Sequence, residues 1–307
     1  MPLIHSPHEL LSGGRKVSLA IGFFDGVHLG HQQIIRQTIT DAAQHQAIPL
    51  VVTFDQHPNA VVAPQHVPPL IYSLPQKLRT INSIGADTIL LLHFDKGFSQ
   101  QTGEAFIRGL AGDLGLIQSI CVGANFVFGH KRGGNVQLLK KLGAELNFTV
   151  HGLAAVSLDS KAVSSTRIRE AIAAGDLDDA SQMLGRAYSL AAVVARGDGL
   201  GRQLGFPTAN LDASGLALPP HGVYAALARA NGEPCRAVVN IGVRPTLKNP
   251  KPELRVEAHL LDFQRDLYGQ ELELIFVEKL RDEKKFDSLD ALRSQITADI
   301  AEAQHRF

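Results

Sequence analysis

The sequence lacks tryptophan, has only two cysteines among 307 residues and carries no net charge. Cys121 and Cys235 lie far apart, so they predict neither a disulfide framework nor paired metal ligands. The balance of 30 basic and 30 acidic residues argues against nucleic acid or an anionic membrane as a partner, although a small bound anion is left open. The scarcity of cysteine favours a protein of the reducing cytoplasm.

Long apolar runs are missing as well. No stretch approaches the roughly 20 residues that span a bilayer, and the start, MPLIHSPHELLSGGRK, has no apolar centre like that of a signal peptide. We expect neither secretion nor membrane insertion. The 45% hydrophobic and 20% charged residues are typical of a globular protein, and the length favours two domains.

The first half of the chain alternates between two kinds of segment. Nearly continuous apolar runs, typical of buried parallel strands, occupy residues 17–22, 49–54, 88–94 and 119–123. Helical patterns lie between them, at residues 31–44, 73–85 and 102–112. This alternation predicts a Rossmann-like α/β domain with a parallel sheet, whose ligands bind beyond the carboxyl ends of the strands.

The second half is rich in β-type segments separated by Gly, Pro and Asn turns. They predict a small antiparallel β-barrel with strands near residues 189–196, 222–230, 235–242, 254–263 and 271–280. Apolar residues at spacings of three and four predict a terminal helix over 288–305. We place the domain boundary at 185–188, which gives domains 1–186 and 187–307.

The strongest local motif is GFFDGVHLGHQ, residues 22–32, between the first predicted strand and the first helix. Glycines allow a tight turn there, and a helix N-terminus attracts phosphate. His28 and His31 could then donate hydrogen bonds to oxygens that gain charge during transfer. Exposed turn histidines and a zinc pair are the alternatives, but no third zinc ligand is evident nearby. Nucleotide-binding candidates here are Gly22, Phe24, Asp25 and Gly30.

A second element, VSSTRIREAI at residues 163–172, indicates a loop that leads into a helix. Ser165 and Thr166 supply hydroxyl groups and Arg169 supplies positive charge, which together suit a triphosphate. The alternative is ordinary capping of a helix followed by solvated arginines. The pairing with the histidine motif favours the nucleotide site.

The third motif is ARGDGLGRQLGFPTANL, residues 195–211. Gly201 and Gly205 permit close approach of the backbone to a ligand, although a glycine-rich barrel turn explains them equally well. Pro207 fixes the backbone, while Thr208 and Asn210 offer oxygens two positions apart, as Mg²⁺ requires. A structural Thr/Asn turn is the alternative.

These motifs resemble a known family. GFFDGVHLGHQ and SSTRIR are similar to the HxGH and SSTxxR motifs of the nucleotidyltransferase superfamily, and with VTFDQHP and VGANFVFGHKRGG they resemble the FMN adenylyltransferase domain of bacterial bifunctional riboflavin kinase/FAD synthetases. The family often has proline at position 56 and an acidic residue at 125, where this chain has Gln56 and Asn125. The resemblance assigns contacts with ATP or FMN to His28, His31, Asn125, Ser165, Thr166 and Arg169.

The second half resembles riboflavin kinases in GRQLGFPTANL, GVYA, VVNIGVRPT, EAHLLDF and LYGQELELIFVEKLRDEKKF. By this resemblance Thr208 and Asn210 bind Mg²⁺ with ATP. Glu257 is then the general base for the neutral riboflavin hydroxyl, although its position alone equally fits an exposed strand residue. The segment 246–253 (TLKNPKPE) has no hydrophobic period, and we expect a mobile loop there.

The resemblance implies a bifunctional enzyme that phosphorylates riboflavin to FMN with ATP and then adenylylates FMN to FAD, releasing pyrophosphate. Its partners would be riboflavin, FMN, FAD, ATP and ADP, with Mg²⁺ as the metal and without nucleic acid or a membrane. A weak homo-oligomer is left open. The alternatives are an active kinase with a silent first domain, a flavin-binding regulator, and transfer to another phosphorylated metabolite.

Overall fold

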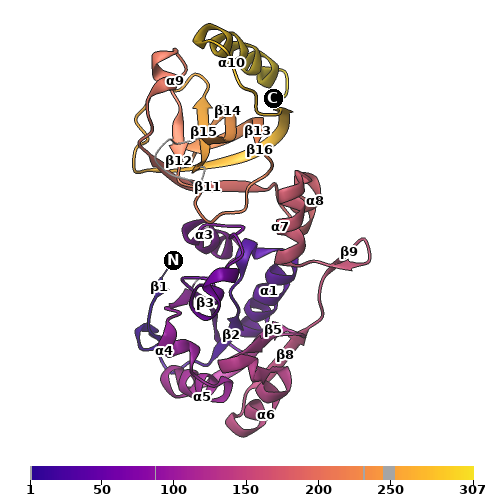
Figure 1. Ribbon diagram of the computed structural model, residues 1–307. Coiled ribbons are helices and arrows are strands. Elements are labelled where there is room, and N and C mark those ends of the chain that lie inside the picture. The colour runs from indigo at the N-terminus through magenta and orange to yellow at the C-terminus, as the bar shows by residue number, and fades with distance from the viewer. Residues whose placement is uncertain (1, 87, 231, 245–252) are drawn as a thin grey trace. The chain divides into compact units, whose positions relative to one another are not determined.

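The computed structural model describes residues 2–86, 88–230, 232–244 and 253–307. By their internal contacts the residues form two compact units, the first with the residues up to Pro69 and Leu74–Ser165, and the second with Leu70–Ser73 and Thr166–Phe307. Figure 1 traces their helices and strands. The predicted boundary at 185–188 stays a prediction, and of the predicted loop 246–253 all but Glu253 lies outside the described residues.

The first unit is built on a parallel six-stranded sheet, which confirms the predicted α/β class. Its strand order is β1–β4–β3–β2–β5–β8. The bounds are β1 Leu3–Ile4, β2 Val17–Ile21, β3 Ile48–Phe54, β4 Thr88–Leu92, β5 Ile117–Gly123 and β8 Thr149–Leu153.

Helices cover both faces of this sheet. On one face α5 (Gly103–Leu114) and α6 (Val136–Leu146) pack against Leu19 and Ile21 of β2, while on the other α1 (Leu29–Gln44) and α3 (Leu74–Ser83) share a cluster with Ala20. Successive residues of β2 are thus buried on opposite faces, as in a central parallel strand. The carboxyl ends of β2, β3 and β5 remain open for ligand contacts.

The remaining segments of the first unit are short. They are η1 Pro7–Glu9, η2 Asp25–Val27, α2 Asn59–Val62, η3 Pro64–His66, α4 Lys96–Ser99, β6 Val127–Phe128, η4 His130–Arg132, β7 Gly134–Asn135, β9 Ser157–Leu158 and β10 Lys161–Ala162.

A buried carboxylate ties α1 to the sheet. Asp41, only 4% exposed, accepts hydrogen bonds from Ser18 on β2 (2.8 Å) and from Ser119 on β5. Burial by itself would raise the pKa of Asp41, but the bonds from Ser119 and Ser18 and the nearby His45 and His151 outweigh it and hold this pKa below its usual value.

The Asp41→Asn variant should therefore be less stable than the wild type at neutral pH, by about 1–3 kcal/mol. Because the pKa is lowered on folding, the carboxylate stabilises the fold above the unfolded pKa of about 3.9 and loses this effect as the pH falls through the folded value. Urea unfolding at pH 7 and at pH 3 measures both free energies. A gap between the two proteins that persists undiminished at pH 3 would contradict this expectation.

The second unit is a closed six-stranded antiparallel barrel, which confirms the predicted antiparallel barrel. The short strand Ala209–Leu211 is not among the five predicted segments. Its order is β11–β12–β15–β14–β13–β16, closed by the pairing of β11 with β16. The bounds are β11 Ser189–Ala195, β12 Ala209–Leu211, β13 Gly222–Ala230, β14 Glu233–Arg244, β15 Glu253–Leu260 and β16 Glu271–Arg281.

Among its described residues this unit also has four helices: α7 Ser165–Ala174, which begins at the last residue of the first unit, α8 Leu177–Leu184, α9 Leu200–Gln203 and α10 Leu289–Gln304. α10 matches the predicted terminal helix and packs Ala303 against Val223, Ala225 and Val238 of the barrel. A buried ion pair between Arg281 of β16 and Asp299 of α10, with N–O distances of 2.8 and 2.7 Å, fixes the helix over the barrel. Within the described residues no helix is long and apolar enough to cross a membrane.

Candidate active sites

The predicted histidine motif forms a strained turn after β2. Phe24 (φ 55°) and Val27 (φ 43°) have left-handed backbones although neither is glycine, and Gly26 (φ 70°) lies between them. Such conformations cost free energy and persist where the surrounding structure enforces them. Phe24, Asp25 and Val27 are all buried, so packing holds the turn in place at the end of the sheet.

His28 ends the turn and caps helix α1. Its Nδ1 accepts a hydrogen bond from the backbone N–H of His31 (3.4 Å), so in the neutral ring the proton lies on Nε2. The two histidine rings stack at 3.6 Å. A side chain at Gly30 would lie 3.2 Å from the His28 ring, so glycine leaves room for that ring.

The two predicted nucleotide motifs meet through Ser165. Its hydroxyl donates to the carbonyl of Asp25 at 3.2 Å, across 140 residues of sequence. Thr166 and Arg169 follow on α7 but belong to the second compact unit, so their approach to the histidine turn stays a prediction.

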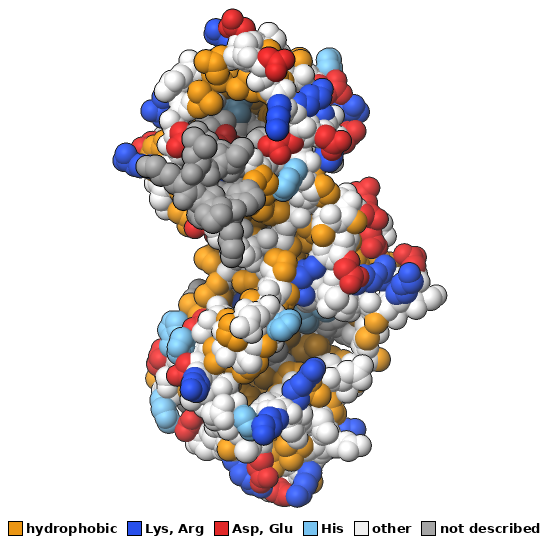
Figure 2. All heavy atoms as spheres, viewed as in Figure 1, with side chains coloured by type: hydrophobic (Ala, Val, Ile, Leu, Met, Phe, Trp, Pro, Cys, Tyr) orange, Lys and Arg blue, Asp and Glu red, His pale blue; other side chains and the backbone are white. Residues whose placement is uncertain are grey.

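A cavity of about 1000 Å³ opens at the carboxyl ends of β2, β3 and β5. Seven of the chain's 14 phenylalanines line it, and their rings contact one another, as between Phe54 and Phe98 (5.6 Å) or Phe126 and Phe128 (5.2 Å). Figure 2 shows hydrophobic and histidine side chains around a hollow in the unit that carries α1. Rings so arranged suit a flat aromatic ligand. The seven are Phe23, Phe54, Phe94, Phe98, Phe106, Phe126 and Phe128.

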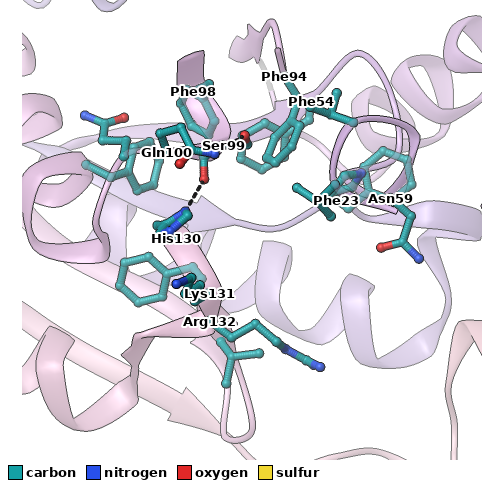
Figure 3. A pocket seen from close by; sticks show the side chains of 18 of the residues that line it. Phe23, Phe54, Asn59, Phe94, Phe98, Ser99, Gln100, His130, Lys131 and Arg132 are labelled. Carbon is teal, nitrogen blue, oxygen red and sulfur yellow. Dashed lines mark hydrogen bonds between the residues drawn. The ribbon is translucent and has the colours of Figure 1, made fainter. Parts of the chain in front are cut away.

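One wall of this cavity is a basic turn, His130, Lys131 and Arg132 (Figure 3). The turn is fixed to the neighbouring loop: His130 N–H donates to the carbonyl of Gln101 (2.8 Å), and His130 Nδ1 lies 3.1 Å from that of Ser99. Lys131 and Arg132 have left-handed backbones (φ 51° and 58°). Gly22 lines the cavity. Asn125 is exposed and directly precedes Phe126, which lines the cavity.

The basic turn depends on Gly129, which has φ 71° and whose added Cβ would lie 2.3 Å from the backbone nitrogen of Gly103. We expect Gly129→Ala to displace the turn and destabilise the protein by about 1–3 kcal/mol. The control Gly112→Ala lies on α5 with nothing within 4 Å and should stabilise by about 0.5–1 kcal/mol. Thermal unfolding measures both, and equal stabilities of the two variants would contradict the role given to Gly129.

The second unit carries its own cavity, of about 380 Å³, outside the barrel wall. Glu257 lines this cavity, and the strand register places Asn210 of β12 and Asn240 of β14 directly beside it on either side. Thr208 lines the same cavity. Along β15 the residues next to Glu257, Val256 and Ala258, are buried in the barrel, so Glu257 points outward into the cavity.

The glycine-rich loop is packed tightly onto the row of side chains formed by Asn210, Glu257 and Asn240. A Cβ at Gly197 would lie 2.2 Å from the Asn210 amide, and one at Gly201 would lie 2.5 Å from the carbonyl of Phe206 and 3.2 Å from Thr208 Oγ1. An ion pair of 2.7 Å between Asp198 and Arg255 joins the loop to β15. Glycine is thus needed here for close approach of the backbone.

Two predicted residues do not line this cavity. Gly205 adopts φ 91° and therefore shapes the loop. Pro207 lines a neighbouring cavity of about 490 Å³, and its carbonyl lies 2.8 Å from His259 Nδ1. Because a carbonyl only accepts, that nitrogen carries the proton.

The side chains present decide whether a metal ion fits. No group of three or more His, Cys, Asp or Glu in the described parts of the chain is arranged to hold a metal ion. The oxygen-bearing Thr208 and Asn210 nevertheless share a cavity with the Glu257 carboxylate, and hard oxygen ligands of this kind fit Mg²⁺ completed by water and phosphate. Both cysteines are free.

Two family patterns match the chain. The FAD synthetase pattern covers residues 12–167, and the riboflavin kinase pattern covers residues 184–307. A crystal structure described as a macrolide-efflux protein from Streptococcus pneumoniae is similar over 99% of this chain and 98% of that one, with a TM-score of 0.81 and 28% identity.

Curated relatives match over almost their whole length. A bifunctional riboflavin kinase/FMN adenylyltransferase of Pseudomonas fluorescens is 38% identical over 305 residues, covering 99% of this chain and 97% of that protein. The Haemophilus influenzae protein of the same name is 35% identical at the same coverage, and that of Escherichia coli K12 is 35% identical over 100% and 98%.

The fold and the family patterns define a two-part ATP-using transferase, with a nucleotidyltransferase sheet and a kinase barrel. The chain belongs to the bifunctional riboflavin kinase/FMN adenylyltransferase family, as its motifs indicate. Reasoning from the sequence missed the phenylalanine cavity wall, the basic turn, Asn240 and Arg255. The VVNIG motif was the only available signal for Asn240, since strand register cannot be read from composition.

Proposed function

We propose that the protein makes FMN in the barrel cavity and FAD in the cavity of the α/β unit, with the residue roles given below. The observation that carries this proposal is the row of Asn210, Glu257 and Asn240 beside Thr208 in one unit, together with an aromatic cavity in the other, whose lining includes Gly22 and Phe23 just before the histidine turn. Both activities are those of the family.

In the kinase step Glu257 accepts the proton of the riboflavin hydroxyl as that oxygen attacks the γ-phosphorus of ATP; the bond from the γ-phosphorus to the bridging oxygen breaks and ADP leaves. Thr208 and Asn210 would hold Mg²⁺, which offsets the charge of the ATP phosphates when bound. The close-packed glycine loop supplies backbone N–H groups to the phosphates, and its ion pair from Asp198 to Arg255 (2.7 Å) keeps the loop against the strand that carries Glu257.

In the transfer step the FMN phosphate is already anionic at neutral pH, so stabilisation of charge matters more than removal of a proton. An FMN phosphate oxygen attacks the α-phosphorus of ATP and pyrophosphate leaves. His28 donates from Nε2 to the transferred phosphate, beside the N-terminus of α1. The phenylalanine wall holds the flavin ring, while the family resemblance assigns ATP contacts to His31, Asn125, Ser165, Thr166 and Arg169.

Chromatography of the flavins formed over time from riboflavin, ATP and Mg²⁺ tests this function. FMN followed by FAD supports both steps. FMN alone would refute the transferase assignment, and unchanged riboflavin would refute the kinase. Replacing FMN by pantetheine phosphate or glycerol phosphate tests the acceptor, since preference for either would overturn the flavin assignment. We further propose a cytoplasmic location, in keeping with two unpaired thiols.

A further inference from the structure

Lys77 of α3 is a buried cation at the end of the sheet. It is 3% exposed, although lysine is among the residues least often buried. Its ammonium donates to the carbonyl of Phe54 at 2.8 Å and to that of Phe23 at 3.2 Å. Phe54 is the last residue of β3 and Phe23 follows the neighbouring strand β2, and both residues line the large cavity.

The same ammonium contacts the cavity wall. It lies 4.2 Å from the centroid of the Phe23 ring, a cation–π contact, and the Phe23 ring meets His57 edge-on at 4.9 Å. Thr53 Oγ1 also donates to the Phe23 carbonyl (3.0 Å). Phe23 directly precedes the strained Phe24. Lys77 therefore contacts the phenylalanine wall of the cavity and also donates a hydrogen bond at the start of the histidine turn.

The charges around Lys77 come from the segments that follow β2 and β3. Asp25 of the histidine turn and Asp55 after β3 attract the ammonium, and Asp55 is itself paired with His93 at 2.5 Å. Burial outweighs this attraction and lowers the pKa of Lys77 to about 8. Neutralisation above that pH would remove the cation–π contact and one of the three donors.

We propose that Lys77 is a positioning residue of the adenylyltransferase site, where it fixes the flavin wall and the histidine turn relative to each other through the carbonyls of Phe23 and Phe54. This inference rests on the proposed transferase function and adds a role for a side chain that contacts neither phosphate. The buried positive charge also favours the approach of the anionic FMN phosphate to ATP, which is anionic as well.

The experiment compares kcat and KM for FMN across pH 6–10 in the wild type, Lys77→Gln, Lys77→Arg and the control Lys141→Gln. Lys141 is exposed on α6. We expect kcat/KM of Lys77→Gln to fall about 10–100-fold, because a small misplacement at a site costs this much. The wild-type and control profiles should decline above pH 8, whereas Lys77→Arg, charged throughout, should be slower but lack that decline.

Two results would overturn the proposal: a folded Lys77→Gln protein with unchanged kcat/KM, or a Lys77→Arg profile that declines as the wild type does. Circular dichroism checks folding of each variant. If Lys77→Gln does not fold, the Lys77→Arg profile decides. Absence of FAD formation in the wild type would instead refute the proposed function. In that case the dissociation constant of FMN would test Lys77. It should be at least tenfold higher for Lys77→Gln than for the wild type, and a smaller rise would reject the role.

Discussion

The Glu257→Gln variant is expected to lose riboflavin phosphorylation by about 10²–10⁴-fold, the usual contribution of a general base. The amide keeps the shape of the side chain between Asn210 and Asn240 but accepts no proton. Riboflavin is a neutral alcohol, so the attacking oxygen then lacks a proton acceptor. The measurement is the initial rate of FMN formation from riboflavin and ATP, together with the rate of FAD formation from added FMN, which should not change.

The matched control is Glu278→Gln. Glu278 lies on barrel strand β16 and approaches Arg306 at 3.4 Å, away from the cavity lining. Both substitutions remove one carboxylate from a barrel strand, so only a role at the site separates them. FMN formation by Glu257→Gln within threefold of the control would exclude Glu257 as the base.

The second large effect is expected at His28. His28→Ala should reduce FAD formation from FMN by about 10²–10³-fold, as when one donor to a developing charge is removed. FMN formation from riboflavin should be unchanged. His28 also caps α1 through Nδ1, so the alanine variant should in addition lose about 1 kcal/mol of stability.

His28→Asn separates the two roles of this histidine. Asparagine is a good N-cap and can accept from the same backbone N–H, but it presents no ring nitrogen in the position of Nε2. We expect this variant to regain the stability in thermal unfolding without regaining the rate. Recovery of the rate together with the stability would mean that His28 acts only as a cap.

Local patterns predicted most of the fold. β2, β3, β4 and β5 are mostly apolar, and the barrel strands are β-type segments separated by turn residues. Both patterns are visible within single segments of the sequence. The two edge strands were missed for physical reasons. β1 has two residues, and β8 reads TVHGL, in which a polar residue and a glycine weaken the pattern.

The candidate sites were predictable where they lie within one motif. His28, Thr208, Asn210 and Glu257 lie at the turn and cavity where their motifs indicated. Side chains that gain meaning only through tertiary contacts were not visible: Lys77 has an ordinary position in a helical pattern, and its burial follows from packing of α3. Phenylalanines spread from Phe23 to Phe128 likewise look like core residues until the fold gathers them.

The row of Asn210, Glu257 and Asn240 makes the spacing of residues along β15 as important as their identity. Side chains of a strand alternate between faces, so deletion of one residue between the loop and Glu257 would turn Ala258 outward and the carboxylate into the barrel interior. An insertion of two residues would keep Glu257 on the outer face but would move it out of register with Asn210 and Asn240. Insertions and deletions in this family should therefore occur in the turns and not in the paired strands β12, β15 and β14, because the pairing of these strands sets the positions of the site residues.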